Sequence, residues 1–358
     1  MLAALALPPL VALLAAAWTS YRRLLPATLV AIGLFGAAAL LTGRDVHVGF
    51  AAAAFAATAV ATGLTFRGNL VAPGGWRDYV TLTKPRIMSL LLLTGLCGML
   101  AGARGWPGTG LLVAAMAGLA MACGGASALN HVLDADIDRL MGERTSSRPV
   151  AAGRVPAAYA LEFGLALSAA SFVLLASVVN VLTAVLALVG NLFYVLVYTR
   201  WLKRSTPQNI VIGGAAGAVP PLVGWAAATG DLTLPAIFLF LIVFFWTPPH
   251  FWALALLIKR DYEAARVPML PVVRGDRETV RQIVLYSLVL LGVTVAPFAA
   301  GSFGLEYLIS ALVLGGAFLA LAWWLRRAPS RPRAAALFHY SLLYLALLFV
   351  AVAIDPIV

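Results

Sequence analysis

The chain has 358 residues, of which 62% are hydrophobic and only 11% are charged. Apolar runs recur along its whole length, and a soluble core cannot bury so many of them, so the composition excludes an ordinary soluble protein. The net charge of +11 does not indicate nucleic-acid binding, because the basic residues fall in the short joints between apolar runs.

A helix that spans a membrane needs about 20 mostly apolar residues. Runs of that length predict an all-α, polytopic membrane bundle with nine spans in the body of the chain and three more before it. We therefore divide the sequence into a three-helix extension over residues 1–75, to which we assign no role, and a nine-helix domain over residues 76–358. The expected spans are 2–20, 25–42, 47–65, 87–103, 110–130, 157–177, 181–199, 208–228, 233–256, 282–300, 305–325 and 335–354.

The basic residues alternate between successive loops, which predicts the orientation of the bundle. Of the 25 Lys and Arg, only Arg44 and Arg104 fall on one face, and the others fall on the opposite face. Loops rich in Lys and Arg stay in the cytoplasm. We therefore expect a protein of the inner (plasma) membrane whose termini both lie outside. No basic segment precedes the first apolar run, so a retained helix is favoured over a cleaved signal peptide.

A cluster of acids follows the second span of the body, in the sequence NHVLDADIDRLMGERTSSRP. Asn130, Asp134 and Asp138 are four residues apart and form one stripe on a continuing helix, whereas Asp136 falls on the other side. Oxygen ligands of this kind suit Mg²⁺, which usually brings phosphate oxygens with it. The alternative is a solvated helix end balanced by neighbouring arginines.

Basic residues near this cluster favour a diphosphate ligand. Arg144 and Arg148 are four residues apart, and guanidinium groups match phosphate oxygens in a bidentate way. Lys203 and Arg204, after the fourth span of the body, are interpreted as further phosphate contacts. Tyr198, just before them, also suits the aromatic belt at the membrane surface.

A second mixture of acids and bases follows the sixth span of the body, in KRDYEAARVPMLPVVRGDR. Asp261 is its best candidate for a metal ligand, and Ala265 stands where a second acid of the stripe would fall. We expect this loop to contribute fewer ligands than the first one.

Five segments in this order resemble the UbiA superfamily of intramembrane prenyltransferases, and within it the enzymes that farnesylate heme. The resemblance covers about residues 76–355. The segments that carry it are TLTKPRI, NHVLDADIDRLMGERTSSRPVAAG, YTRWLKRSTPQNIVIGG, FFWTPPHFWALAL and DYEAARVPMLPVV.

The resemblance implies a nine-helix bundle around a central cavity, with two Mg²⁺ ions on the cytoplasmic side. Its implied substrates are farnesyl diphosphate and heme B, its product is heme O, and a heme A synthase is a possible downstream partner. The implied metal ligands are Asn130, Asp134, Asp138 and Asp261. The implied diphosphate contacts are Arg144, Arg148, Tyr198, Lys203 and Arg204, with Lys84 and Arg86 closing the rim.

His250, in WTPPHFW, is the candidate residue on the heme side, because imidazole is a common axial ligand of heme iron. Its alternative is a hydrogen-bonded structural role between helices. Two other functions stay open. One is prenylation of an aromatic or quinone precursor, which would favour a fuller second acidic stripe, and the other is transport, which would favour charges near mid-membrane.

Overall fold

A computed structural model describes residues 74–355 of the chain, without the side chain of Arg144. The expected extension and its three spans therefore lie outside the described residues, except for Gly74 and Gly75 at its end.

Every regular element in the described range is a helix. Backbone N–H and C=O groups find no partner in lipid, and a helix satisfies them within its own segment. The elements are α4 (Trp76–Leu82), α5 (Pro85–Ala103), α6 (Thr109–Leu133), α7 (Ala135–Leu140), α8 (Glu143–Ser146), α9 (Ala157–Leu174), the π-helical segment η1 (Leu175–Val179), α10 (Val181–Leu192), the π-helical segment η2 (Phe193–Leu202), α11 (Lys203–Ser205), α12 (Asn209–Thr229), α13 (Leu234–Leu257), α14 (Lys259–Ala264), α15 (Leu270–Val273), α16 (Gly275–Ala299), α17 (Leu305–Arg327) and α18 (Arg331–Ile354).

Within residues 74–355, nine helical stretches are long and apolar enough to cross a membrane, and each has 19–25 residues. This confirms the expected number for the body of the chain. The seventh stretch begins at Gly275 rather than at 282, and its first turn contains Asp276 and Glu278. Acidic residues stabilise a helix N-terminus, so this helix extends beyond the apolar run that predicted it.

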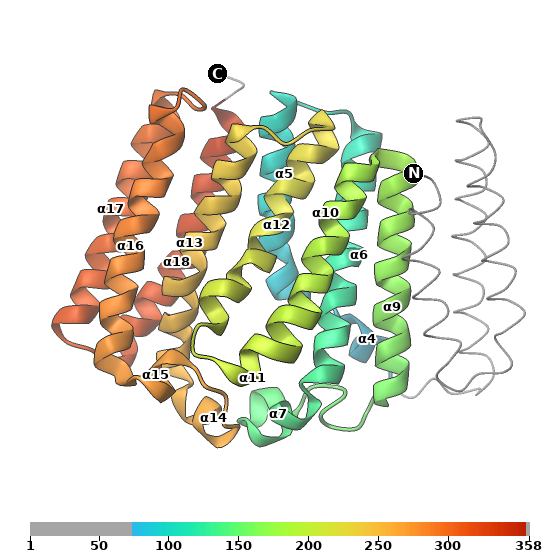
Figure 1. The fold of residues 1–358 in the computed structure, drawn as a ribbon, viewed down its shortest axis with the longest axis vertical. Coiled ribbons are helices and arrows are strands. Elements are labelled where there is room, and N and C mark those ends of the chain that lie inside the picture. The colour runs from blue at the N-terminus through green and yellow to red at the C-terminus, as the bar shows by residue number, and fades with distance from the viewer. Residues whose placement is uncertain (1–73, 356–358) are drawn as a thin grey trace, which may run out of the picture.

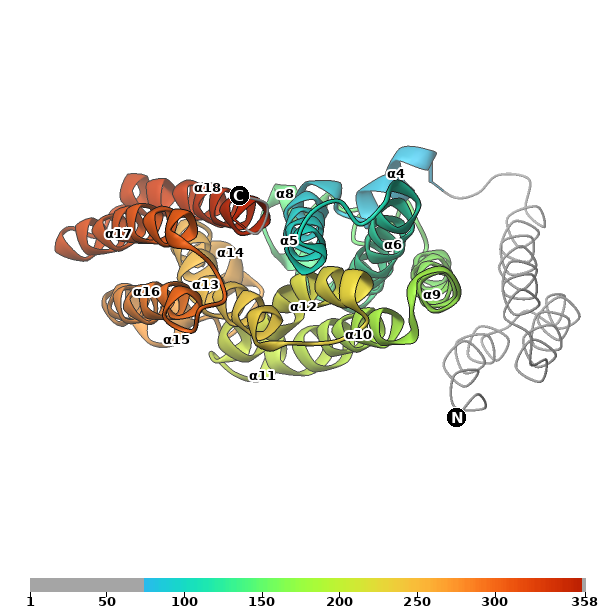
Figure 2. The ribbon, with the colours of Figure 1, turned by 90° about the horizontal axis from the view of Figure 1, so that it is seen from above.

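The long helices stand side by side, and the short helices α7, α11, α14 and α15 gather at one end of the bundle (Figure 1). Seen from above, α16, α17 and α18 lie at one side, α6 and α9 at the other, and α5, α10 and α12 between them (Figure 2). The short helices carry both acidic clusters, so the fold brings the two loops to the same end.

Helices α5 and α12 pack very closely, and glycine makes this possible. A Cβ on Gly224 would stand 1.8 Å from the carbonyl oxygen of Gly95, and one on Gly98 would stand 2.6 Å from that of Pro221. Small residues let membrane helices approach closely. The close contact holds α5 against the centre of the bundle, and the residue before α5 belongs to the site described below.

We expect Gly224→Ala to destabilise the protein by about 1–3 kcal/mol, because the added methyl group overpacks the contact between α5 and α12. Gly217→Ala, in the same helix, is the matched control, since a Cβ there meets nothing within 4 Å. Thermal unfolding in detergent measures both. Equal melting temperatures for the two variants would contradict the close contact.

Candidate active site

Asn130, Asp134 and Asp138 lie on one side of a nearly continuous helix, as predicted. Helix α6 ends before Asp134 and α7 begins after it, yet Asp134 N donates to Asn130 O at 2.9 Å and Asp138 N donates to Asp134 O at 2.8 Å. Asp134, which we call the hinge between α6 and α7, therefore keeps the helical spacing. All three residues are buried, with exposed fractions of 3%, 0% and 1%, so the alternative of a solvated helix end does not describe them.

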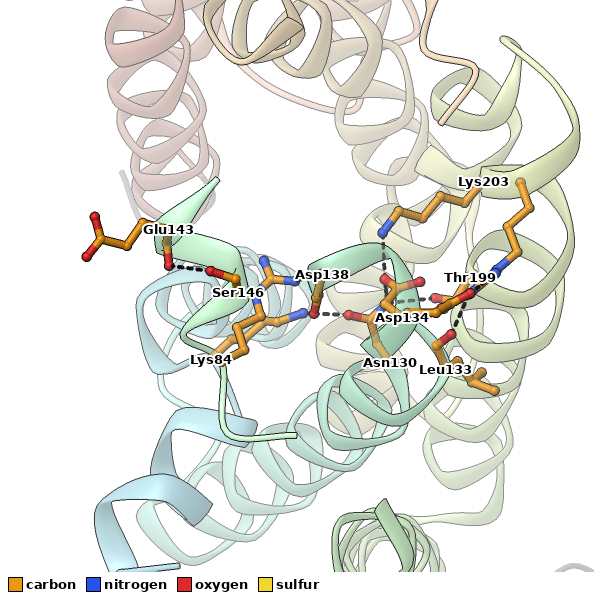
Figure 3. Close-up of polar contacts among 12 residues, drawn as sticks. Lys84, Asn130, Leu133, Asp134, Asp138, Glu143, Ser146, Thr199 and Lys203 are labelled. Carbon is orange, nitrogen blue, oxygen red and sulfur yellow. Dashed lines mark hydrogen bonds and ion pairs between the residues drawn. The ribbon is translucent and has the colours of Figure 1, made fainter. Parts of the chain in front are cut away.

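Asn130, Asp134 and Asp138 form a column on which Lys84 and Lys203 converge from distant segments (Figure 3). Arg148 joins them from the loop that follows the column. Lys203 Nζ lies 2.5 Å from Asp134 Oδ2, and Arg148 Nη1 lies 2.7 Å from Asp138 Oδ1. Lys84 Nζ donates to Asn130 Oδ1 at 2.6 Å. Removing one partner of a buried ion pair leaves a costly unpaired charge, so these three cations allow the column to stay buried and ionised.

The carboxamide of Asn130 has only one orientation that fits its neighbours. A carboxylate oxygen only accepts, so the amide nitrogen must face Asp134, and the amide oxygen accepts from Lys84. The amide nitrogen then donates to Asp134 Oδ2 at 2.8 Å and to Thr199 Oγ1 at 3.1 Å. Thr199 is fully buried in η2. Sequence reasoning missed it, because nothing in the sequence reveals that a threonine in an apolar run meets this amide.

Two carboxylate oxygens in the column have no partner. Asp134 Oδ1 and Asp138 Oδ2 are buried and accept no hydrogen bond. Unpartnered buried oxygens next to a helix hinge fit a bound cation, and hard oxygen ligands suit Mg²⁺. Within residues 74–355, no three His, Cys, Asp or Glu side chains gather closely enough to hold a metal by themselves. A metal here would therefore need ligands from a bound molecule as well.

Asp261 lies against the first acidic loop. A Cβ built on Gly142, at the start of α8, would stand 3.1 Å from both carboxylate oxygens of Asp261. Glycine at position 142 therefore leaves room for this carboxylate. Asp261 is the first-turn acid of α14, and the two acidic loops meet at this point.

Ala265 is part of a small apolar cluster between the two loops, together with Ile137 and Tyr262. Its exposed fraction is 7%. The position where a second stripe acid would fall thus serves packing, and this agrees with the expectation that the second loop supplies fewer ligands. Burial raises the pKa of the neighbouring Tyr262 to about 12, so its hydroxyl stays protonated.

The pKa shifts differ among the residues in and around the column. Burial raises the pKa of Asp138, and its ion pair with Arg148 opposes that shift. Burial, with repulsion from Arg148, lowers the pKa of Lys84 to about 7. Lys84 also has a left-handed backbone, with φ of 51°, a conformation that residues other than glycine rarely adopt. Such strain collects at functional sites.

Several candidate residues lie elsewhere. Arg204 makes two bonds of 2.7 Å to Asp136, on the other side of α7, and donates to Leu133 O. Tyr198 stacks on Tyr194 at 5.5 Å between ring centroids. Arg86 is exposed at the start of α5, and Arg144 lies in α8 with its side chain outside the described part.

His250 lies in α13 between the rings of Trp246 and Phe338, at 4.3 and 4.9 Å. Its Nδ1 is 2.5 Å from Ser341 Oγ, and that hydroxyl donates to Phe338 O at 2.6 Å. Since the single hydroxyl proton is used there, Nδ1 is the donor to Ser341. In a neutral imidazole, Nε2 then keeps its lone pair.

A cleft of about 230 Å³ opens on the outer side of α7. None of Asn130, Asp134 and Asp138 lines it, so it is separate from the column. Its lining residues are Asp136, Ile137, Leu140, Arg204, Ala265, Arg266 and Val267.

The fold and the site define an intramembrane helical protein that holds a buried acidic pair, ringed by cations, at one end of its bundle. The profile of the UbiA prenyltransferase family matches residues 91–349, which is more than half of the chain. The chain belongs to the UbiA prenyltransferase family.

Relatives named protoheme IX farnesyltransferase are similar through the body of the chain. The one from Symbiobacterium thermophilum is 54% identical over 281 residues, covering 78% of this chain and 94% of the relative. The one from Roseiflexus sp. (strain RS-1) is 48% identical over 338 residues, covering 88% and 63%. One from Thermus thermophilus is 54% identical over 280 residues, covering 78% and 46%. The chain thus spans about half to two thirds of the length of the last two.

Solved structures share the fold. A digeranylgeranylglyceryl phosphate synthase superposes with a TM-score of 0.65 at 18% identity, covering 78% of this chain and 98% of that one. A UbiA homolog from Archaeoglobus fulgidus, bound to GPP and Mg²⁺, has a TM-score of 0.57 at 16% identity, covering 77% and 99%. At this identity the likeness shows the fold alone.

We expect Ala265→Asp to destabilise the protein by about 1–3 kcal/mol, because it buries a carboxylate among apolar side chains. Ala264→Asp is the matched control, since Ala264 is the preceding residue in the chain and is exposed. Thermal unfolding in detergent measures the difference. If Ala265→Asp is as stable as the control, position 265 does not serve packing.

Proposed function

We propose that this chain transfers the farnesyl group of farnesyl diphosphate to a vinyl group of heme B, giving heme O and diphosphate. The observation that carries the proposal is the 54% identity to the Symbiobacterium thermophilum protoheme IX farnesyltransferase, which extends over 94% of that relative. The product would serve the formation of heme A for cytochrome oxidase, so a heme A synthase is the expected downstream partner.

In this proposal the acidic column holds the metal. Asp134 and Asp138 would bind Mg²⁺ through their unpartnered oxygens, and Asp261 would approach from the second loop. We expect two ions, as the resemblance to the UbiA superfamily implies, and the unpartnered oxygens of Asp134 and Asp138 are available to them. Asn130 would orient Asp134 through its amide nitrogen, and its oxygen would reach an ion only after Lys84 leaves it.

Lys203, Arg148 and Lys84 would donate hydrogen bonds to the diphosphate, because they already surround the column. Arg144 would extend this ring from α8, and Arg86 would lie at its rim. Bound Mg²⁺ supplies further neutralisation of the leaving diphosphate. The C1–O bond of the farnesyl chain breaks, the vinyl group forms a bond to C1, and water then adds hydroxide to the resulting cation and releases a proton. Apolar walls must exclude water from the allylic cation until the vinyl group attacks.

Arg204 and Tyr198 are less suited than Lys203, Arg148 and Lys84 to contact the diphosphate directly. Arg204 already donates to Asp136, and Tyr198 lies against Gly213, where a Cβ would stand 2.3 Å from its ring. We assign both to the support of the site. The ring of Tyr198 packs against the apolar cluster that contains Ile137, Tyr262 and Ala265.

His250 is the candidate for the heme side. Its Nδ1 donates to Ser341, so its Nε2 keeps the lone pair that an iron ligand needs. The flanking rings of Trp246 and Phe338 would favour packing of the flat porphyrin nearby.

The protein is a multi-pass membrane protein with nine candidate spans in its described part. We propose that it lies in the plasma membrane with the two acidic loops in the cytoplasm and both termini outside. The supporting observation is the distribution of Lys and Arg between alternate loops.

Purified full-length protein with heme B, farnesyl diphosphate and Mg²⁺ is expected to yield heme O, detected by mass spectrometry. Omission of the metal, with a chelator present, should stop the reaction. Parallel incubation with 4-hydroxybenzoate tests the alternative acceptor class. Prenylated 4-hydroxybenzoate without heme O would overturn the proposal.

Asp134→Ala is expected to abolish heme O formation, because it removes a buried ligand and leaves Lys203 unpaired. Asp136→Ala is the matched variant two residues away, with an exposed carboxylate that faces Arg204. Exposed ion pairs contribute about 0–1 kcal/mol, so its rate should stay within about fivefold of the wild type. If both variants insert equally into the membrane and lose heme O formation to a similar degree, the column has no distinct role.

A further inference from the structure

The loop between α17 and α18 concentrates positive charge without any acid. Arg326 and Arg327 end α17, and Arg331 and Arg333 lie in the first turn of α18. No Asp or Glu occurs between residues 307 and 354. Within residues 74–355, none of these four arginines forms an ion pair. We call residues 326–333 the arginine loop.

The neighbouring loops at this end of the bundle mix basic and acidic residues. Helix α17 ends and α18 begins at the same end as α14 and α15 (Figure 1). Basic residues of those other loops form ion pairs, namely Lys203 with Asp134, Arg204 with Asp136, Lys259 with Asp276 and Arg281 with Glu278. The arginine loop therefore differs from its neighbours because nothing in the described part of the chain balances its charge.

Two exposed tryptophans fix the depth of the arginine loop in the membrane. Trp323 and Trp324 are 45% and 44% exposed near the end of the α17 span. Tryptophan at the end of a membrane span lies at the level of the lipid headgroups. The guanidinium of Arg326 lies 5.2 Å from the ring centroid of Trp323, and that of Arg333 lies 4.5 Å from the centroid of Trp324. The arginines therefore lie at headgroup level as well.

The structure of the two helices accounts for only part of this charge. Arg333 Nη1 donates to Trp324 O at 2.9 Å and to Ala328 O at 3.1 Å, so it satisfies carbonyl groups at the end of α17. A cation in the last turn of a helix is favourable, which suits Arg327. Arg331 is the first residue of α18, where the partial positive charge of a helix N-terminus disfavours a cation.

Arg327 and Arg331 are the side chains of the loop that stay available. Both are exposed, and neither takes part in the ring contacts that hold Arg326 and Arg333. Within residues 74–355, no acidic side chain pairs with either of them. Two free guanidinium groups thus lie between two anchored ones, beside the exposed tryptophan rings.

We propose that the arginine loop binds the headgroup of an anionic phospholipid, whose phosphodiester accepts hydrogen bonds from Arg327 and Arg331. Guanidinium groups match phosphate oxygens in a bidentate way. Basic residues beside a membrane span attract anionic lipids. The exposed rings of Trp323 and Trp324 give the lipid an apolar surface directly next to these cations.

A lipid fits this surface better than an acidic protein does. The tryptophan rings place the arginines at the depth where lipid phosphates already surround the bundle, so the headgroup needs no further element of the fold to reach them. The inference does not depend on the proposed reaction, because no residue of the arginine loop belongs to the acidic column or to the surroundings of His250.

Native mass spectrometry of the full-length protein in detergent tests the proposal. The protein is mixed with equal amounts of phosphatidylglycerol and phosphatidylcholine that carry the same acyl chains, and the bound lipids are counted. We expect wild-type protein to retain phosphatidylglycerol at least about fivefold over phosphatidylcholine, because one basic residue near an anionic lipid contributes about this factor. The double variant Arg327→Gln with Arg331→Gln should lose this preference.

The double variant Arg274→Gln with Arg277→Gln is the matched control. Both arginines are exposed at the start of α16, where Asp276 and Glu278 lie among them. The control loses the same charge at the same end of the bundle, yet it should keep the preference for phosphatidylglycerol. Arg327→Lys with Arg331→Lys retains the charge and should keep most of the preference, and thermal unfolding verifies that every variant is folded. If the glutamine pair does not fold, the single variant Arg331→Gln should weaken the preference in the same direction.

Three outcomes would overturn the proposal. Equal retention of the two lipids by the wild type would leave an acidic protein as the occupant of the arginine loop. An unchanged preference in the folded Arg327→Gln, Arg331→Gln variant would place the lipid elsewhere. Displacement of phosphatidylglycerol by inorganic phosphate, but not by chloride at equal ionic strength, would show that the loop binds free phosphate instead of a lipid.

Discussion

The burial of Asp134 and Asp138 at the end of an apolar bundle is the constraint on which the rest of the site depends. An unpaired buried carboxylate costs several kcal/mol, so cations must accompany it. Lys203 comes from the end of the fourth span, Arg148 from the loop after the second, and Lys84 from the residue before the first. These segments are distant in sequence. Their ion pairs and hydrogen bonds therefore require three helix ends to meet, and the close contact between α5 and α12 supports the position of Lys84.

The second loop is attached to the first mainly by apolar contact. Ala265 and Tyr262 share a cluster with Ile137 of α7, and Gly142 leaves room for Asp261. An apolar contact holds the loops together at little electrostatic cost, whereas another acid at position 265 would add one more buried charge to compensate. The loop can therefore present a single carboxylate to the site. Position 265 serves packing while Asp261 supplies the carboxylate, which explains why the second acidic stripe is incomplete.

The nine spans and the acidic column could be predicted because both follow from simple periodicities. Apolar runs of membrane length give the spans, and a spacing of four residues gives the column. Partners could not be predicted in the same way. Thr199 meets Asn130 only because η2 passes beside α6, and Arg204 faces Asp136 although its neighbour Lys203 faces Asp134. Such choices depend on tertiary arrangement, and a π-helical segment leaves no pattern in the sequence that would reveal it.

The pairing of Arg204 gives Asp136 a role that its position in the motif does not reveal. Arg204 bonds both carboxylate oxygens of Asp136 and also Leu133 O, at the end of α6. It therefore ties the two sides of the hinge at Asp134 together, and this hydrogen bonding lowers the pKa of Asp136 to about 2. Lys203 and Arg204 are adjacent in sequence yet act on opposite sides of the same hinge. One neutralises the column, and the other joins the end of α6 to α7.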